Sequence, residues 1–204
     1  PYLGRGARFD PTAILRIFRS PDFRASACGY FGHMWELYAF YAFLPVLLAT
    51  RLGGSDAAVS GWSFAAIAAG MLGCVVGRLL SGRLGSARVA FWQLSASGLC
   101  CLASPLMFHA PLPLFLGFLL FWGVVVAGDS PQFSALNARF APPALVGSAL
   151  TIVNSIGFFV TIVSVGLLGS VLGAIGPQYL FLLLVPGPMA GLWMLRRLAF
   201  TARQ

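Results

Sequence analysis

Charged side chains are scarce in this sequence. Only 9% of its 204 residues are charged and 59% are hydrophobic, whereas a typical soluble domain carries roughly 25% charged residues. The mean hydropathy is +0.88. Because so few charges cannot cover the surface of a soluble domain, the composition excludes a soluble globular fold.

Lysine is absent, so arginine supplies all 13 basic residues, against only 5 acidic ones. A formal net charge of +8 could suggest a nucleic-acid partner, since a strongly basic chain is one footprint of such binding. These arginines, however, flank hydrophobic runs and form no basic surface interleaved with aromatic side chains. We therefore exclude nucleic acid as a partner and interpret the arginines as signals of membrane topology.

Local signatures of enzymes and metal sites are also missing. The sequence contains no HExxH, no P-loop, no CxxC and no GxSxG with a partner acid. The cysteines lie in apolar stretches without histidine or carboxylate at ligand spacing, which is typical of small buried hydrophobes; they are Cys28, Cys74, Cys100 and Cys101. We predict no enzyme, no bound metal and no cofactor.

Long uncharged stretches point to helices that cross a membrane. No charged residue occurs in residues 57–77, 89–128 or 140–195, and a helix needs roughly 20 apolar residues to span a bilayer. We predict an all-α membrane protein whose six-helix domain covers residues 25–198, with spans at about 25–50, 57–80, 89–108, 112–136, 145–172 and 179–195. Residues 1–24 form a basic linker with a short interfacial helix, and residues 199–204 form a tail.

The arginines also orient the predicted helices, since cytoplasmic loops carry the excess of basic residues. With six spans both termini share one side, and that side holds every arginine except Arg51. The sequence therefore predicts that both termini are cytoplasmic.

Small residues recur along two of the predicted spans. The second span carries a stripe at intervals of four, comprising Gly61, Ala65, Ala69, Gly73, Gly77 and Ser81; the fifth carries Gly166, Gly169 and Gly173. Such stripes let helix backbones approach closely within a membrane. We expect both to be packing faces, with a gating role as the less favoured alternative.

Two acidic residues lie deep within the predicted spans, where an ionisable group costs roughly 2.5–3.5 kcal/mol on insertion scales. Glu36 follows His33 by one helical turn and lies about 18 Å along the helix from Arg24. Asp129 shares a helix face with Trp122 and Gln132. We interpret Glu36 and His33 as candidates for proton transfer.

The same positions suggest contacts with a solute. Candidates for lining its cavity are Asp129, Gln132, Asn154, Trp122 and Phe40. The alternative is that these polar groups only join helices, through interhelical hydrogen bonds or a buried pair between Asp129 and an arginine such as Arg139.

Three segments resemble the carboxy-terminal half of a bacterial major facilitator superfamily transporter. Residues 77–89 read GRLLSGRLGSARV, and Gly77, Arg83, Gly85 and Arg88 match the cytoplasmic loop motif of that family. The family's acidic position holds Gly82 here, and the spacing from Gly77 is one residue longer. Two further similar segments are GYFGHMWELYAFYAFLP and GDSPQFSALNARFAPPALVGSALTIVNSIGF.

The resemblance implies a fold, a partner and an activity. The fold would be a six-helix half with a 3+3 inverted repeat, in the bacterial inner membrane, paired with an amino-terminal six-helix half that this chain lacks. The activity would be secondary transport of a small solute by alternating access, coupled to protons. In that family the helices equivalent to residues 25–50 and 112–136 commonly line the cavity, which favours Glu36 and Asp129.

Two other functions remain open on the sequence. One is a self-standing six-span channel or structural module that acts as a homodimer. The other, which we favour least, is an intramembrane enzyme.

Overall fold

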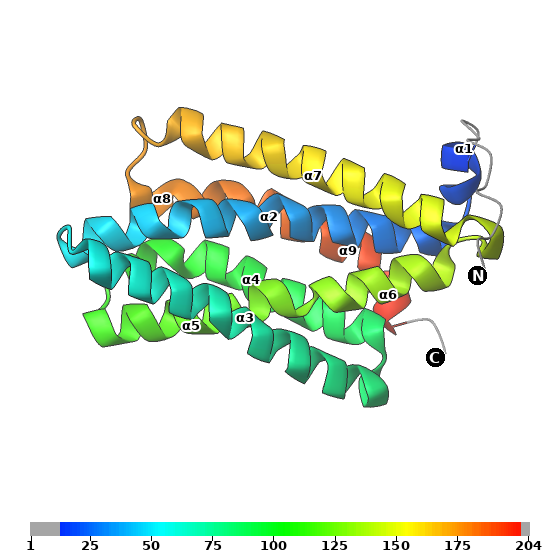
Figure 1. The fold of residues 1–204 in the computed structure, drawn as a ribbon, viewed down its shortest axis with the longest axis horizontal. Coiled ribbons are helices and arrows are strands. Elements are labelled where there is room, and N and C mark those ends of the chain that lie inside the picture. Colours follow the sequence, from blue (N-terminus) through cyan, green and yellow to red (C-terminus); the bar gives the residue numbers. More distant parts are fainter. Residues whose placement is uncertain (1–12, 201–204) are drawn as a thin grey trace, which may run out of the picture.

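The computed structural model of the protein describes residues 13–200, and every regular element in that range is helical (Figure 1). The elements are α1 (Ala13–Ile17), α2 (Pro21–Leu52), α3 (Asp56–Leu84), α4 (Ser86–Phe108), α5 (Leu112–Gly128), α6 (Ser130–Phe140), η1 (Pro143–Leu145), α7 (Val146–Val171), α8 (Pro177–Leu180), η2 (Phe181–Leu184) and α9 (Pro186–Phe200). Most of the predicted linker and tail, including Arg5, Arg8 and Arg203, lies outside the described residues.

Within the described residues, five helical segments are long and apolar enough to cross a membrane. They are Asp56–Leu84, Ser86–Phe108, Leu112–Phe140, Pro143–Val171 and Pro177–Phe200. The chain therefore has the all-helical architecture and the apolar helices of an integral membrane protein. The remaining long helix, α2, is not among the five, and its sequence includes Asp22, Arg24, Glu36 and Arg51.

Helix α2 occupies the centre of the bundle. It packs against α9, α7, α6 and α3, while α3 packs mainly against α5. Figure 1 shows the long helices running along one common axis, with α7 at one edge, α3 and α5 at the other, and α2 between them. Many side chains of α2 are consequently buried, including those of His33 and Glu36.

Local signals in the sequence set the ends of α2. At its start, Ser20 Oγ accepts a hydrogen bond from the Phe23 backbone N–H at 3.3 Å, and Pro21 occupies the first turn, where a proline loses no helical hydrogen bond. At its end, Gly53 adopts the left-handed conformation with φ of 67°, which glycine adopts without steric cost. The helix runs through Pro45 to Leu52, so it is longer than the predicted span at 25–50.

Two of the predicted spans are interrupted. The span expected at 112–136 divides at Asp129 into α5 and α6 and continues to Phe140. The span expected at 179–195 begins with α8 and a 3-10 turn before α9 starts at Pro186 and runs to Phe200. Pro131 and Pro186 each lack the backbone N–H that would bond to the carbonyl four residues earlier, so each break coincides with a missing helical hydrogen bond.

The small-residue stripe predicted on residues 61–81 packs only in part. The buried small residues of α3 are Ser63, Ala66, Gly70, Gly73 and Gly77, at alternating intervals of three and four. Gly61 is in open space, whereas a Cβ atom at Gly73 would collide with the Val124 carbonyl of α5. Because a helix has 3.6 residues per turn, residues at strict intervals of four progress around its surface. The predicted stripe therefore does not stay on the face of α3 that contacts α5.

The glycine stripe predicted near the end of the fifth span makes almost no contact within this chain. Gly166 and Gly173 have open space where a side chain would lie, and Gly169 has only the ring of Phe43 nearby, 3.9 Å from a Cβ built there. The packing glycine of α7 is Gly157, which faces Tyr30 and Met34.

Two apolar clusters form the core. One surrounds Phe40, Trp122 and Phe181, and the other surrounds Phe23 and Phe133. Along α2 the second cluster ends at Met34 and the first begins at Leu37. Buried polar residues occupy the boundary between the clusters; we call them the polar layer, and they are His33, Glu36, Ser97, Asp129 and Gln132.

Candidate functional site

Glu36 lies in the polar layer with no solvent-exposed surface (0%). Its Oε1 atom accepts a hydrogen bond from the Trp122 indole N–H of α5 at 2.9 Å and one from the Cys101 thiol of α4 at 3.4 Å. Its Oε2 atom lies 2.9 Å from Ser97 Oγ, also on α4. Both carboxylate oxygens are therefore paired, so this buried acid is not an isolated charge.

The surroundings of Ser97 suit both protonation states of Glu36. Ser97 Oγ lies within hydrogen-bonding distance of Glu36 Oε2 and of the Leu94 carbonyl oxygen, at 3.2 Å. A hydroxyl has one proton to donate but can also accept. With an ionised Glu36, Ser97 donates to the carboxylate; with a protonated Glu36, the acid donates to Ser97, which then donates to Leu94. Only hydrogen atoms need to move.

His33 and Asp129 form the second half of the polar layer. His33 Nδ1 lies 2.9 Å from Asp129 Oδ1, and the two side chains are 2% and 0% exposed. His33 Nε2 lies 2.8 Å from Ser130 Oγ. Although the first distance is that of an ion pair, neither Asp129 oxygen has a donor aligned as a hydrogen bond requires, so the imidazole is the group placed to balance this carboxylate.

The helix break positions Asp129. Pro131 cannot donate to the Ala127 carbonyl, and the Asp129 backbone N–H turns back to that carbonyl instead. The Cys74 thiol of α3 also donates to the Ala127 oxygen at 3.5 Å. The interruption therefore places Asp129 between two helical segments, α5 and α6.

The predicted aromatic candidates pack in the core. The rings of Phe40 and Trp122 lie 4.6 Å apart between centroids, and Phe181 lies 5.1 Å from Trp122. All three side chains are fully buried. The structure thus brings Trp122 to Glu36 as a hydrogen-bond donor, while Phe40 supports the indole ring from α2.

Two other candidates divide between the inside and the outside of the bundle. Gln132 is buried on α6, in the polar layer. Asn154 lies on the exposed face of α7, outside the polar layer. The buried polar residues of α7 are Thr161 and Ser164, and the Thr161 hydroxyl donates to the Met34 carbonyl at 2.8 Å. Arg139 is exposed, and the partner of Asp129 is His33, not Arg139.

The residues matched to the loop motif lie along the last two turns of α3 and the start of α4. Gly85 is the single residue between these helices, with φ of 82°, and its N–H donates to the Ser81 carbonyl. Gly77 packs beside Gly128 and Gln93. Arg88 Nε donates to the Ala199 carbonyl at 3.0 Å, joining α4 to α9, and Arg83 is exposed.

Sequence reasoning missed several buried polar partners. Ser97, Cys101 and Ser130 contact the ionisable residues, and Ser26 Oγ donates to Asn137 Oδ1 at 2.6 Å between α2 and α6. The sequence pattern predicts Cys101 only as a small hydrophobe. A search for Ser and Cys at the same depth as Glu36 would have found Ser97 and Cys101. Within residues 13–200 no three His, Cys, Asp or Glu side chains are grouped to hold a metal ion.

The sequence was also compared with known proteins. No known family matches the sequence, and no curated protein matches it. The geometry of the polar layer is therefore the main basis for a functional proposal.

Proposed function

We propose that this chain is one six-helix unit of a secondary transporter, that it moves a small solute by alternating access, and that Glu36 carries the coupled proton. The observation that carries the proposal is the hydrogen-bonding arrangement around Glu36. A fully buried acid with partners for both its ionised and protonated forms meets the chemical requirement for taking up and releasing a proton in place.

The depth of Glu36 supports this role. It follows Arg24 by twelve residues, about 18 Å along the helix, and a bilayer hydrocarbon core is about 30 Å thick. If α2 is the sixth span beside the five candidate segments, Glu36 lies near the middle of the membrane. Transporters hold substrate and coupling ions at that depth.

The His33–Asp129 pair supplies a second group that can exchange a proton. In the neutral tautomer that donates at Nδ1 the imidazole accepts at Nε2, and an imidazolium donates at both. Ser130 Oγ can serve either state of His33, since a hydroxyl both donates and accepts. His33 lies one helical turn from Glu36 on α2, so the two candidate proton carriers are neighbours on one helix.

The distribution of arginine and the family resemblance support the wider assignment. Arg24, Arg83, Arg139 and Arg197 lie near the ends of helical segments that meet at one end of the bundle, and Arg51 lies at the other end (Figure 1). We propose cytoplasmic termini on the positive-inside rule. The resemblance to the major facilitator superfamily adds a second six-helix half and the bacterial inner membrane.

The test is proton-driven solute uptake by the full protein in proteoliposomes. Glu36→Gln keeps the size of the side chain but removes the exchangeable proton, and we expect it to abolish uptake while the protein stays folded. Asp56→Asn is the matched control, because Asp56 is an exposed carboxylate in the first turn of α3; this variant should transport normally.

Three results would count against the proposal. Undiminished uptake in Glu36→Gln removes Glu36 from the mechanism. Loss of uptake together with loss of folding makes Glu36 a structural link between helices. If the wild-type protein forms a stable homodimer and moves no solute under a proton gradient, a self-standing membrane module is the better description.

A further inference from the structure

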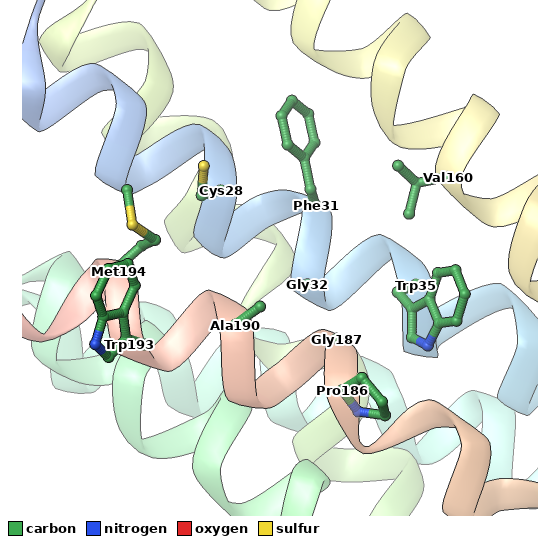
Figure 2. Close-up of a pocket in the computed structure, with 10 residues that line it drawn as sticks. All are labelled: Cys28, Phe31, Gly32, Trp35, Val160, Pro186, Gly187, Ala190, Trp193 and Met194. Carbon is green, nitrogen blue, oxygen red and sulfur yellow. The ribbon is translucent and has the colours of Figure 1, made fainter.

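An apolar groove runs along the outside of the bundle between α2, α7 and α9 (Figure 2). It has a volume of about 450 Å³. Phe31 and Trp35 of α2, Val160 of α7 and Trp193 of α9 line it. The Trp35 indole N–H donates to the Leu183 carbonyl at 3.2 Å, so the polar atom of that ring is engaged with the protein.

Close helix packing forms one side of the groove. A Cβ atom at Gly32 would collide with the Gly187 backbone, and one at Gly187 would lie 2.6 Å from Trp35. The two helices therefore touch backbone to backbone where these glycines meet. Ala190, one turn further along α9, is exposed and also borders the groove. Small residues therefore form the floor of the apolar groove, and large side chains surround it.

A basic cavity of about 370 Å³ adjoins one end of this groove. Trp193 and Met194 line both spaces, so the two are direct neighbours. Arg24, Arg196 and Arg197 line the basic cavity, together with a single acid, Asp22. Three guanidinium groups facing one carboxylate give this cavity a net positive charge.

Two of these arginines are held in position. The guanidinium carbon of Arg196 lies 5.2 Å from the Trp193 ring centroid, a cation–π distance. Arg24 Nη1 donates to the Phe18 and Arg19 carbonyls at 3.0 and 3.3 Å. The positive charge is therefore fixed at the mouth of the apolar groove.

The dimensions agree with one leaflet of a bilayer. Pro186 to Met194 spans about 12 Å of helix, and half of the hydrocarbon core measures about 15 Å. The arginines lie at the end of the bundle where α2 begins and α9 ends, at the level expected for lipid headgroups if these helices cross the membrane. Basic pockets between membrane helices are suited to anionic headgroups.

We propose that the groove and the basic cavity together bind one anionic phospholipid. An acyl chain lies in the groove beside Phe31 and Trp35, and the phosphate lies between Arg24, Arg196 and Arg197. The shared Trp193 side chain marks the junction between chain and headgroup, where amphipathic aromatic rings are favoured. A free anion would use the basic cavity alone, whereas a lipid requires both spaces.

The first test is a binding titration of the purified protein in detergent, followed by native mass spectrometry. The probes are phosphatidylglycerol and phosphatidylcholine with identical acyl chains. We expect preferential binding of phosphatidylglycerol, and we expect Arg196→Gln/Arg197→Gln to weaken that binding roughly 30-fold. Arg78→Gln/Arg83→Gln removes two exposed arginines outside the cavity and should leave it unchanged.

The second test separates a lipid from a free anion. Ala190→Phe fills the groove without changing charge, and we expect it to weaken phosphatidylglycerol binding while excess inorganic phosphate displaces little lipid. Equal binding of the two lipids, or an equal loss in both double-arginine variants, would overturn the proposal. Normal lipid binding by Ala190→Phe together with complete displacement by phosphate would reduce the site to an anion site and would overturn it as well.

Discussion

Ser97 Oγ lies 2.9 Å from Glu36 Oε2 and 3.2 Å from the carbonyl oxygen of its own helix at Leu94. One hydroxyl proton therefore has two acceptors, and the choice between them depends on whether Glu36 carries a proton. This relationship connects the deepest acid of α2 to α4 without a second charged group. Ser97 is therefore a positioning residue, and the effect of its hydrogen bond can be measured separately from the effect of its packing.

Replacing Ser97 by alanine should impair coupled transport. Ser97→Ala removes the hydroxyl that can hydrogen-bond to Glu36 in both its ionised and its protonated state. A net hydrogen bond contributes about 1 kcal/mol, which corresponds to a loss of roughly five-fold in the rate of proton-driven uptake. Ser104→Ala is the matched control, because Ser104 is also buried on α4 and donates only to the Cys101 carbonyl, at 2.8 Å. Equal rates in the two variants would remove Ser97 from the mechanism.

The indole donor of Trp122 should stabilise the fold more than that of Trp35. Trp122→Phe keeps an aromatic ring against Phe40 but leaves Glu36 without its α5 donor, so we expect a loss of about 1.5–3 kcal/mol. Trp35→Phe removes a bond to a neutral carbonyl and should cost about 0.5–1.5 kcal/mol. Denaturant titration in detergent micelles measures both, and the opposite order would contradict this account of Glu36.

The His33–Asp129 contact should show strong energetic coupling. Breaking a buried pair from one side costs about 3–5 kcal/mol, because it strands the other group, whereas replacing both groups by apolar ones costs far less. We therefore expect His33→Leu and Asp129→Leu each to destabilise the protein strongly and the double variant to recover most of the loss. Unfolding free energies of the four proteins test this, and simple additivity would show that the two side chains act independently.

The packing face of α3 predicts different outcomes at two glycines. Gly73→Ala forces a methyl group into the Val124 carbonyl, and such overpacking costs about 1–3 kcal/mol. Gly61→Ala adds a methyl group in open space and should cause no loss of stability. Thermal unfolding of the two variants in detergent compares them directly. Equal melting temperatures would contradict the close approach of α3 and α5.

Much of this arrangement was predictable from the sequence, because charge-free runs and arginine-rich turns follow directly from what a bilayer accepts. The all-helical class and the long apolar helices belong to this group. The breaks at Asp129 and before Pro186 were not predicted. Both prolines were visible, but whether a proline kinks a membrane helix or divides it depends on the neighbouring helices that satisfy the freed carbonyl.

The partners of the deep acids were less predictable. Periodicity places His33 and Glu36 on one face of a helix, but it does not tell which helix faces them. The sequence predicts Trp122 and Asp129 as solute contacts, whereas the fold uses them to contact Glu36 and His33. Asn154, predicted alongside them, lies on the exposed side of α7. The rotation of each helix about its axis, set by packing with its neighbours, decides between these outcomes.

Reversible protonation of Glu36 is the central claim of the proposed function. Infrared difference spectroscopy of the full protein in membranes, recorded as the pH is changed, follows the C=O stretching band of protonated carboxylic acids. In the wild type we expect a band that forms when the pH is lowered and disappears when it is raised. Asp56→Asn should show the same pH response, and Glu36→Gln should lack the band. A spectrum of Glu36→Gln identical to that of the wild type would contradict the claim.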